Sequence, residues 1–95
     1  MDTSTPAFVI IGGGLAGCEC ALALARAGLA CTLYEQKPEA FSPAHTSPLL
    51  CELVCSNSFR SNDAQGSGVG LLKEEMRKLH SATMAVAETC SVPAG

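Results

Sequence analysis

The sequence predicts an α/β fold with an incomplete parallel sheet. Three observations in residues 7–35 predict it: an apolar run rich in β-branched residues, a G-x-G-x-x-G spacing directly after it, and a helical segment that leads to a second apolar run. Strand, glycine turn, helix and strand in this order form a βαβ unit. This unit is the N-terminal part of a Rossmann-like, dinucleotide-binding domain.

The elements of this unit have clear limits. Ala7 to Ile11 reads as a strand buried on both faces, as in a parallel sheet. A helix is predicted from Leu15 to about Ala27, and Gly28 suits the left-handed position that ends it. The second strand covers residues 31–34 and ends at Glu35.

Each glycine of the G-x-G-x-x-G turn has a physical purpose. Gly12 allows the tight turn, Gly14 lets a pyrophosphate approach the backbone, and Gly17 lets the helix pack close to the strands. N–H groups at the start of the helix then bind the phosphates, and Glu35 accepts hydrogen bonds from ribose hydroxyls. We therefore predict dinucleotide binding. The alternative, a glycine turn that binds nothing, does not explain the carboxylate.

The middle of the chain is less regular. Residues 36–48 contain three prolines and are predicted to form a loop, whereas residues 49–55 could form a short strand or a helical turn. Residues 56–70 are a polar loop, which either is simply exposed or binds an anion or a flavin edge. Its candidate donors are Ser56, Asn57, Ser58 and Arg60.

A single helix is predicted from Leu71 to about Ala87. Its apolar stripe consists of Leu72, Met76, Leu79, Thr83 and Val86, and Glu74 with Lys78 forms an i,i+4 pair. Three basic residues share another face, which is either solvated or touches RNA phosphate. They are Lys73, Arg77 and His80.

Composition limits the possible classes of protein. The 95 residues allow at most one small domain, and a net charge of −3 excludes an overall basic nucleic-acid-binding domain. Residues 1–6 do not resemble a signal peptide and no apolar run is long enough to span a membrane, so we expect a cytoplasmic protein. Two strands make a poor parallel sheet, and we expect residues 1–95 to be the N-terminal portion of a longer enzyme.

Six cysteines are many for this length. We interpret them as reduced thiols, as is usual in the cytoplasm. There is no C-x-x-C pair, and His45 with Cys51 and Cys55 matches no standard zinc spacing. We therefore predict no metal site.

Four stretches after the glycine turn carry a resemblance to a known family: PAH at 43–45, ELVCSNSFRSN at 52–62, VGLLKEEMRKL at 69–79 and CSVPAG at 90–95. They resemble the bacterial folate- and FAD-dependent tRNA uracil-5-methyltransferases (TrmFO), which are related to the glucose-inhibited division protein A family of tRNA-modifying flavoproteins. The resemblance covers nearly the whole chain.

The resemblance implies an activity. Such an enzyme takes a one-carbon unit from 5,10-methylenetetrahydrofolate, places it on C5 of the T-loop uridine of tRNA, and uses FAD that NAD(P)H reduces. Glu35 would hold the ribose of FAD, and Cys55 would be a thiol near the flavin, acting as nucleophile or as partner of the flavin. The flavin-binding stretch of the family maps onto Gly12, Gly13, Gly14, Leu15, Ala16 and Gly17.

Chemistry supports a role for Cys55. C5 of uracil is a weak nucleophile until a group such as a thiolate adds at C6. We expect a neighbouring cation such as Arg60 to favour the thiolate. Two alternatives stay open: another FAD-dependent oxidoreductase, and a non-catalytic nucleotide-binding module. We expect the 95 residues alone to be inactive.

Overall fold

The computed structural model describes residues 7–55 and 59–91 of the chain. The chain divides into two compact units, Met1–Val54 and Cys55–Gly95. Each unit is described below by itself.

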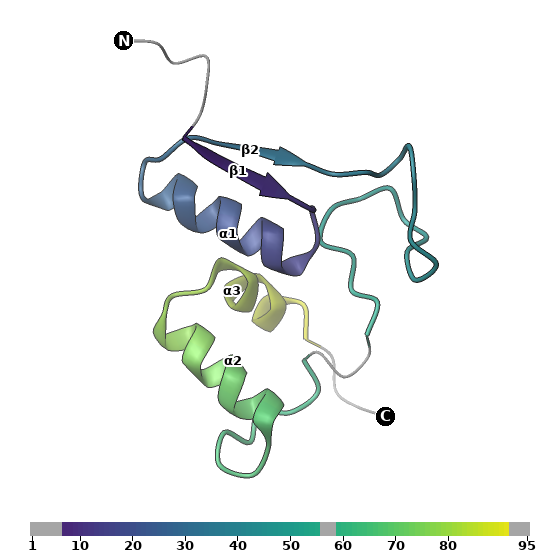
Figure 1. Ribbon diagram of the computed structural model, residues 1–95. Coiled ribbons are helices and arrows are strands. Elements are labelled where there is room, and N and C mark those ends of the chain that lie inside the picture. The colour runs from purple at the N-terminus through teal and green to yellow at the C-terminus, as the bar shows by residue number, and fades with distance from the viewer. Residues whose placement is uncertain (1–6, 56–58, 92–95) are drawn as a thin grey trace. The chain divides into compact units, whose positions relative to one another are not determined.

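The first unit contains the predicted βαβ arrangement. Strand β1 spans Phe8–Ile11, helix α1 spans Leu15–Arg26 and strand β2 spans Cys31–Tyr34. The strands pair in parallel with Phe8 opposite Cys31 and Ile11 opposite Tyr34. Helix α1 lies along one face of this two-stranded sheet (Figure 1). The α/β fold class and the order of these elements are confirmed.

Glycine ends helix α1 as predicted. Ala27 is the C-cap of α1, and Gly28 follows it with a φ angle of 75°. Only glycine adopts this left-handed conformation without a steric penalty from a Cβ atom. The chain can therefore reverse directly into β2.

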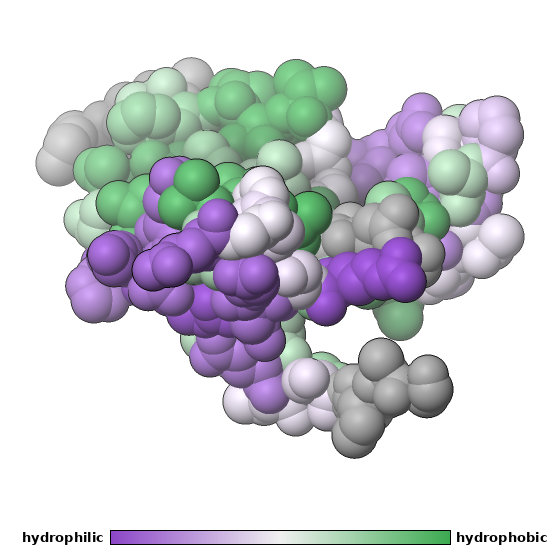
Figure 2. All heavy atoms as spheres, turned by 90° about the horizontal axis from the view of Figure 1, so that it is seen from below, coloured by the Kyte–Doolittle hydropathy of each residue, from purple (hydrophilic) through white to green (hydrophobic). Residues whose placement is uncertain are grey.

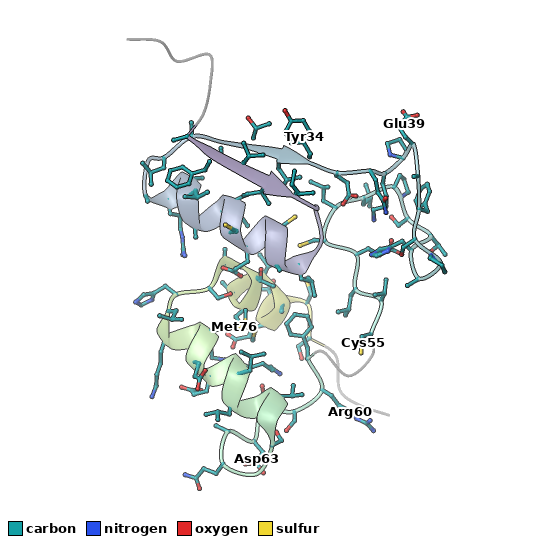
Figure 3. The ribbon with its side chains drawn as sticks, in the orientation of Figure 1. Tyr34, Glu39, Cys55, Arg60, Asp63 and Met76 are labelled. Atoms are coloured by element: carbon teal, nitrogen blue, oxygen red, sulfur yellow. The ribbon has the colours of Figure 1, made fainter. Side chains whose placement is uncertain are left out.

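The two faces of the sheet differ in burial. Ile10 lies on the face covered by α1 and is partly buried, whereas Val9 and Ile11 on the other face are 60% and 80% exposed. Tyr34 also points away from α1 (Figure 3) and is 59% exposed. The prediction that β1 is buried on both faces is wrong for the described residues, because α1 covers only one of them.

Residues 36–55 follow β2 as irregular backbone. The predicted loop over residues 36–48 is confirmed, and residues 49–55 form neither a strand nor a helical turn. Cys51 has a φ angle of 58°, which breaks any regular structure in this apolar run.

The second unit contains two helices where one was predicted. Helix α2 spans Gly68–Lys78 and α3 spans Ala82–Thr89. His80 between them has a φ angle of 60°, and the Ser81 side chain accepts a hydrogen bond from the Met84 backbone N–H at the start of α3. The prediction of a continuous helix is wrong because a left-handed residue and a new N-cap interrupt it.

The break also changes the predicted helix faces. Leu72 and Leu79 of the predicted stripe are 57% and 78% exposed, while Met84, outside that stripe, is 2% exposed. Glu74 forms an ion pair with Arg77, three residues later, and not the predicted pair with Lys78. Figure 2 shows mostly hydrophilic residues on the surface that faces the viewer. In the part of the chain that the structure describes, no helix is long and apolar enough to cross a membrane.

Candidate functional site

The glycine turn between β1 and α1 has the geometry that its spacing predicts. Gly12 has a φ angle of 105° and donates its backbone N–H to Tyr34 O at 2.7 Å. A Cβ atom on Gly17 would collide with the carbonyl oxygen of Gly12, so the absence of a side chain lets α1 approach the end of β1. A Cβ atom on Gly14 would meet nothing within 4 Å.

The N-terminus of α1 is suited to an anion. Gly14 is its N-cap and provides no side-chain hydrogen bond, and the first turn contains no acidic residue. The first N–H groups of a helix have no partner within the helix, and the helix dipole adds positive potential there. The space beside Gly14 and these N–H groups together leave room for a phosphate.

Glu35 places its carboxylate at the same turn. Its Oε2 accepts the Gly13 backbone N–H at 2.9 Å, and its Oε1 accepts the Lys37 backbone N–H at 3.3 Å. The Lys37 N–H, more than that of Gly13, lowers the pKa of Glu35 below its usual value, so the group is ionised at neutral pH. A carboxylate has about four lone-pair positions, which leaves capacity for the two hydroxyls of a ribose.

Two thiols lie against the carbonyl groups of this turn. Cys18 Sγ donates to Gly13 O at 3.3 Å, and Cys51 Sγ donates to Gly14 O at 3.9 Å. Burial of the Cys51 thiol, together with its hydrogen bond to Cys18, raises its pKa. All six cysteines are free thiols, and no group of metal-binding side chains is found among residues 7–55 and 59–91.

A second set of residues at the turn was not predicted. Lys37 and Glu52 form an ion pair with 3.1 Å between Nζ and Oε1, and the side chains are only 4% and 16% exposed. Their separation along the sequence matches no local spacing rule. The one available signal was a charged residue, Glu52, inside the apolar run of residues 49–55.

The structure brings Gly12–Gly17 and Glu35 together, but Cys55 belongs to the second unit. Cys55 and Arg60, both labelled in Figure 3, are exposed. Three of the predicted loop donors, at positions 56–58, lie outside the described residues. The proposed chemistry of Cys55 stays a prediction.

Neither interpretation of the face formed by Lys73, Arg77 and His80, a solvated face or one that touches RNA phosphate, fits Lys73 and Arg77. Lys73 is buried, at 6% exposure, and donates to Phe59 O at 2.9 Å. Arg77 pairs with Glu74 and Glu88, and Glu88 in particular raises the pKa of this guanidinium. These two cations stabilise the second unit internally and do not present a face for RNA phosphate.

Comparison with known proteins gives a consistent result. The profile of a family described as Glucose inhibited division protein A matches residues 7–94. Proteins named methylenetetrahydrofolate–tRNA-(uracil-5-)-methyltransferase TrmFO are similar to the chain. The one from Lawsonia intracellularis is 66% identical over 88 residues, which are 93% of this chain and 20% of that protein. The one from Nitratidesulfovibrio vulgaris strain DP4 is 65% identical over 95 residues, which are 100% of this chain and 19% of that protein. The chain thus spans about a fifth of the length of these relatives.

Proposed function

The chain belongs to the glucose inhibited division protein A family, and on this basis we propose that residues 1–95 are the N-terminal FAD-binding portion of a folate-dependent tRNA uracil-5-methyltransferase. Relatives that carry this name are 66% and 65% identical to the chain. The observation that carries the proposal is the turn itself, where an open Gly14, an uncapped helix N-terminus and an ionised carboxylate meet.

These residues fit the adenosine diphosphate half of FAD. The backbone N–H groups of Gly14, Leu15, Ala16 and Gly17 would receive the diphosphate at the start of α1, while Gly13 gives its N–H to Glu35. Glu35 would accept hydrogen bonds from the ribose. An anion at this position also disfavours a ribose carrying a 2′-phosphate, so the site selects FAD over a phosphorylated dinucleotide.

Cys55 is proposed as the catalytic thiol. Its thiolate would form an S–C6 bond to uracil and shift the C5–C6 π electrons toward C5 and the C4 oxygen, which makes C5 nucleophilic. C5 would then bond to the methylene carbon of the folate. Loss of the C5 proton would break the bond from that carbon to nitrogen and release tetrahydrofolate, leaving an exocyclic methylene on uracil. A hydride added to this methylene would complete the methyl group and expel the Cys55 thiolate, which breaks the S–C6 bond. Cys55 is exposed, which allows a base to reach it. A role beside the flavin is the alternative for the same thiol.

The complete reaction needs three small molecules and one macromolecule. 5,10-Methylenetetrahydrofolate would supply the carbon, bound FAD in its reduced form would supply two electrons, and NAD(P)H would replace them. The nucleic-acid substrate would be the T-loop of tRNA. A cytoplasmic location, where tRNA and folate meet, is part of the proposal.

The direct test uses the intact gene product loaded with FAD. It is incubated with methylenetetrahydrofolate, NADPH and a tRNA transcript, and nucleosides are analysed by mass spectrometry. We expect 5-methyluridine, and none with a transcript whose T-loop uridine is cytidine. Oxidation of NADPH without methyl transfer would instead favour another FAD-dependent oxidoreductase.

A binding test examines the turn independently of activity. Gly14→Val places a branched side chain in the open space beside α1, and we expect it to abolish FAD binding while circular dichroism stays unchanged. A folded Gly14→Val protein saturated with FAD would contradict the proposed geometry. If the unsubstituted protein binds no flavin, a non-catalytic module is the better interpretation.

A further inference from the structure

A segment far from the glycine turn in sequence lies directly against it. The backbone N–H of Cys51 donates to Gly13 O at 2.9 Å. A Cβ atom built on Gly13 would lie 2.6 Å from Leu50 Cδ2 and 2.8 Å from Glu35 Oε2. The Leu50 side chain therefore sits beside both the turn and the carboxylate, and it is still 51% exposed.

The ion pair of Lys37 and Glu52 fixes the backbone of residues 49–52. Lys37 Nζ donates to Leu49 O at 2.7 Å and to Glu52 Oε1 at 3.1 Å. It thus contacts the residues on either side of Leu50 and Cys51. Lys37 also donates its backbone N–H to Glu35, so one residue connects the carboxylate and the 49–52 segment.

Glu52 also binds the backbone of residues 46 and 47. Its Oε2 accepts the Thr46 N–H at 3.1 Å, and its Oε1 accepts the Ser47 N–H at 3.2 Å. Both carboxylate oxygens are therefore in use within the protein. An apolar pair of similar volume could stabilise the protein as well as a buried ion pair does, so the ion pair is of interest here because its hydrogen bonds fix one geometry of the loop.

We propose that Lys37 and Glu52 are positioning residues for the nucleotide site, and that they act by holding Leu50 where it packs on the adenosine half of the bound dinucleotide. This inference rests on the proposed function. Leu50 is the contact residue, because it is exposed next to the carboxylate that holds the ribose. Lys37 and Glu52 do not touch the ligand, since their polar atoms are bound to the loop.

The experiment measures dissociation constants for FAD and for ADP by calorimetry, with the intact protein. Lys37→Met and Leu50→Ala should each weaken both ligands about tenfold, and Lys37→Arg should restore most of the affinity. Lys78→Met, which removes an exposed lysine of α2, is the matched control and should change neither constant.

A double-mutant cycle tests whether Lys37 acts through Leu50. If Lys37 acts through Leu50, adding Leu50→Ala to Lys37→Met causes no further loss, whereas independent effects multiply. Multiplied losses would overturn the proposal.

One further variant covers the case in which Lys37→Met unfolds the loop. Lys37→Met/Glu52→Met removes both charges together and avoids an unpaired buried carboxylate. A folded double variant that binds ADP as tightly as the unsubstituted protein would overturn the inference and leave the proposed function intact. Failure of the unsubstituted protein to bind FAD or ADP would overturn both.

Discussion

Substitution of Gly17 by alanine tests the close approach of α1 to β1. On helix propensity alone, alanine inside a helix is better than glycine by about 1 kcal/mol. Here, however, the new Cβ would collide with the Gly12 carbonyl oxygen and lie 3.0 Å from the Gly12 carbonyl carbon. Overpacking costs roughly 1–3 kcal/mol, and the upper part of that range applies because backbone atoms cannot rotate away. The expected net loss is about 2 kcal/mol in the free energy of unfolding.

The assay is urea denaturation of the ligand-free protein, followed by circular dichroism. Gly14→Ala is the matched control, because its Cβ would meet nothing within 4 Å and its φ angle of −80° suits any residue. We expect that control to lose less, about 1 kcal/mol, which is the cost of placing alanine at an N-cap where glycine is preferred. An unchanged or raised unfolding free energy for Gly17→Ala would refute the close-packing argument.

Three other substitutions give separate outcomes. Cys55→Ala in the intact gene product should retain FAD but lose methyl transfer, and a full rate measured on tRNA would remove this thiol from the mechanism. Backbone N–H groups, led by that of Thr46, lower the pKa of Glu52 from 4.5 to about 2, so its stabilising effect should be present above pH 4.5 and be lost as the pH falls toward 2. Acid unfolding monitored by circular dichroism should therefore be less steep in Glu52→Gln, and identical profiles would contradict the hydrogen-bond geometry. Ser81→Ala should cost about 1 kcal/mol by thermal denaturation, because it removes the N-cap of α3.

The part of the fold that the sequence predicts best depends on local rules. Residues 8–34 form β1, α1 and β2 within one residue of the predicted limits. Gly12 and Gly28 adopt the positive φ angles that their places at element ends require. The position of Glu35 also follows, because a residue at the end of a parallel strand lies beside the turn that ends its neighbour.

The features that sequence reasoning missed depend on contacts between residues distant in sequence, or on the backbone conformation of a single residue. Lys37 and Glu52 meet through the folded loop, so no periodicity marks them as partners. The helix break at His80 and Ser81 is masked by an apolar pattern that continues across it, although serine followed by an apolar run is a known N-cap signal. The sequence also could not show that Lys73 and Arg77 have partners inside the second unit, which removes them from a face open to solvent or RNA.

The pairing of only two strands has a practical consequence. Among the described residues, β1 and β2 each have one side without a neighbouring strand, and so each offers a row of free backbone N–H and C=O groups. Such rows can hydrogen-bond to any extended peptide of suitable length, including another copy of the chain. Solutions of residues 1–95 alone should therefore be checked for self-association by light scattering across the concentration range.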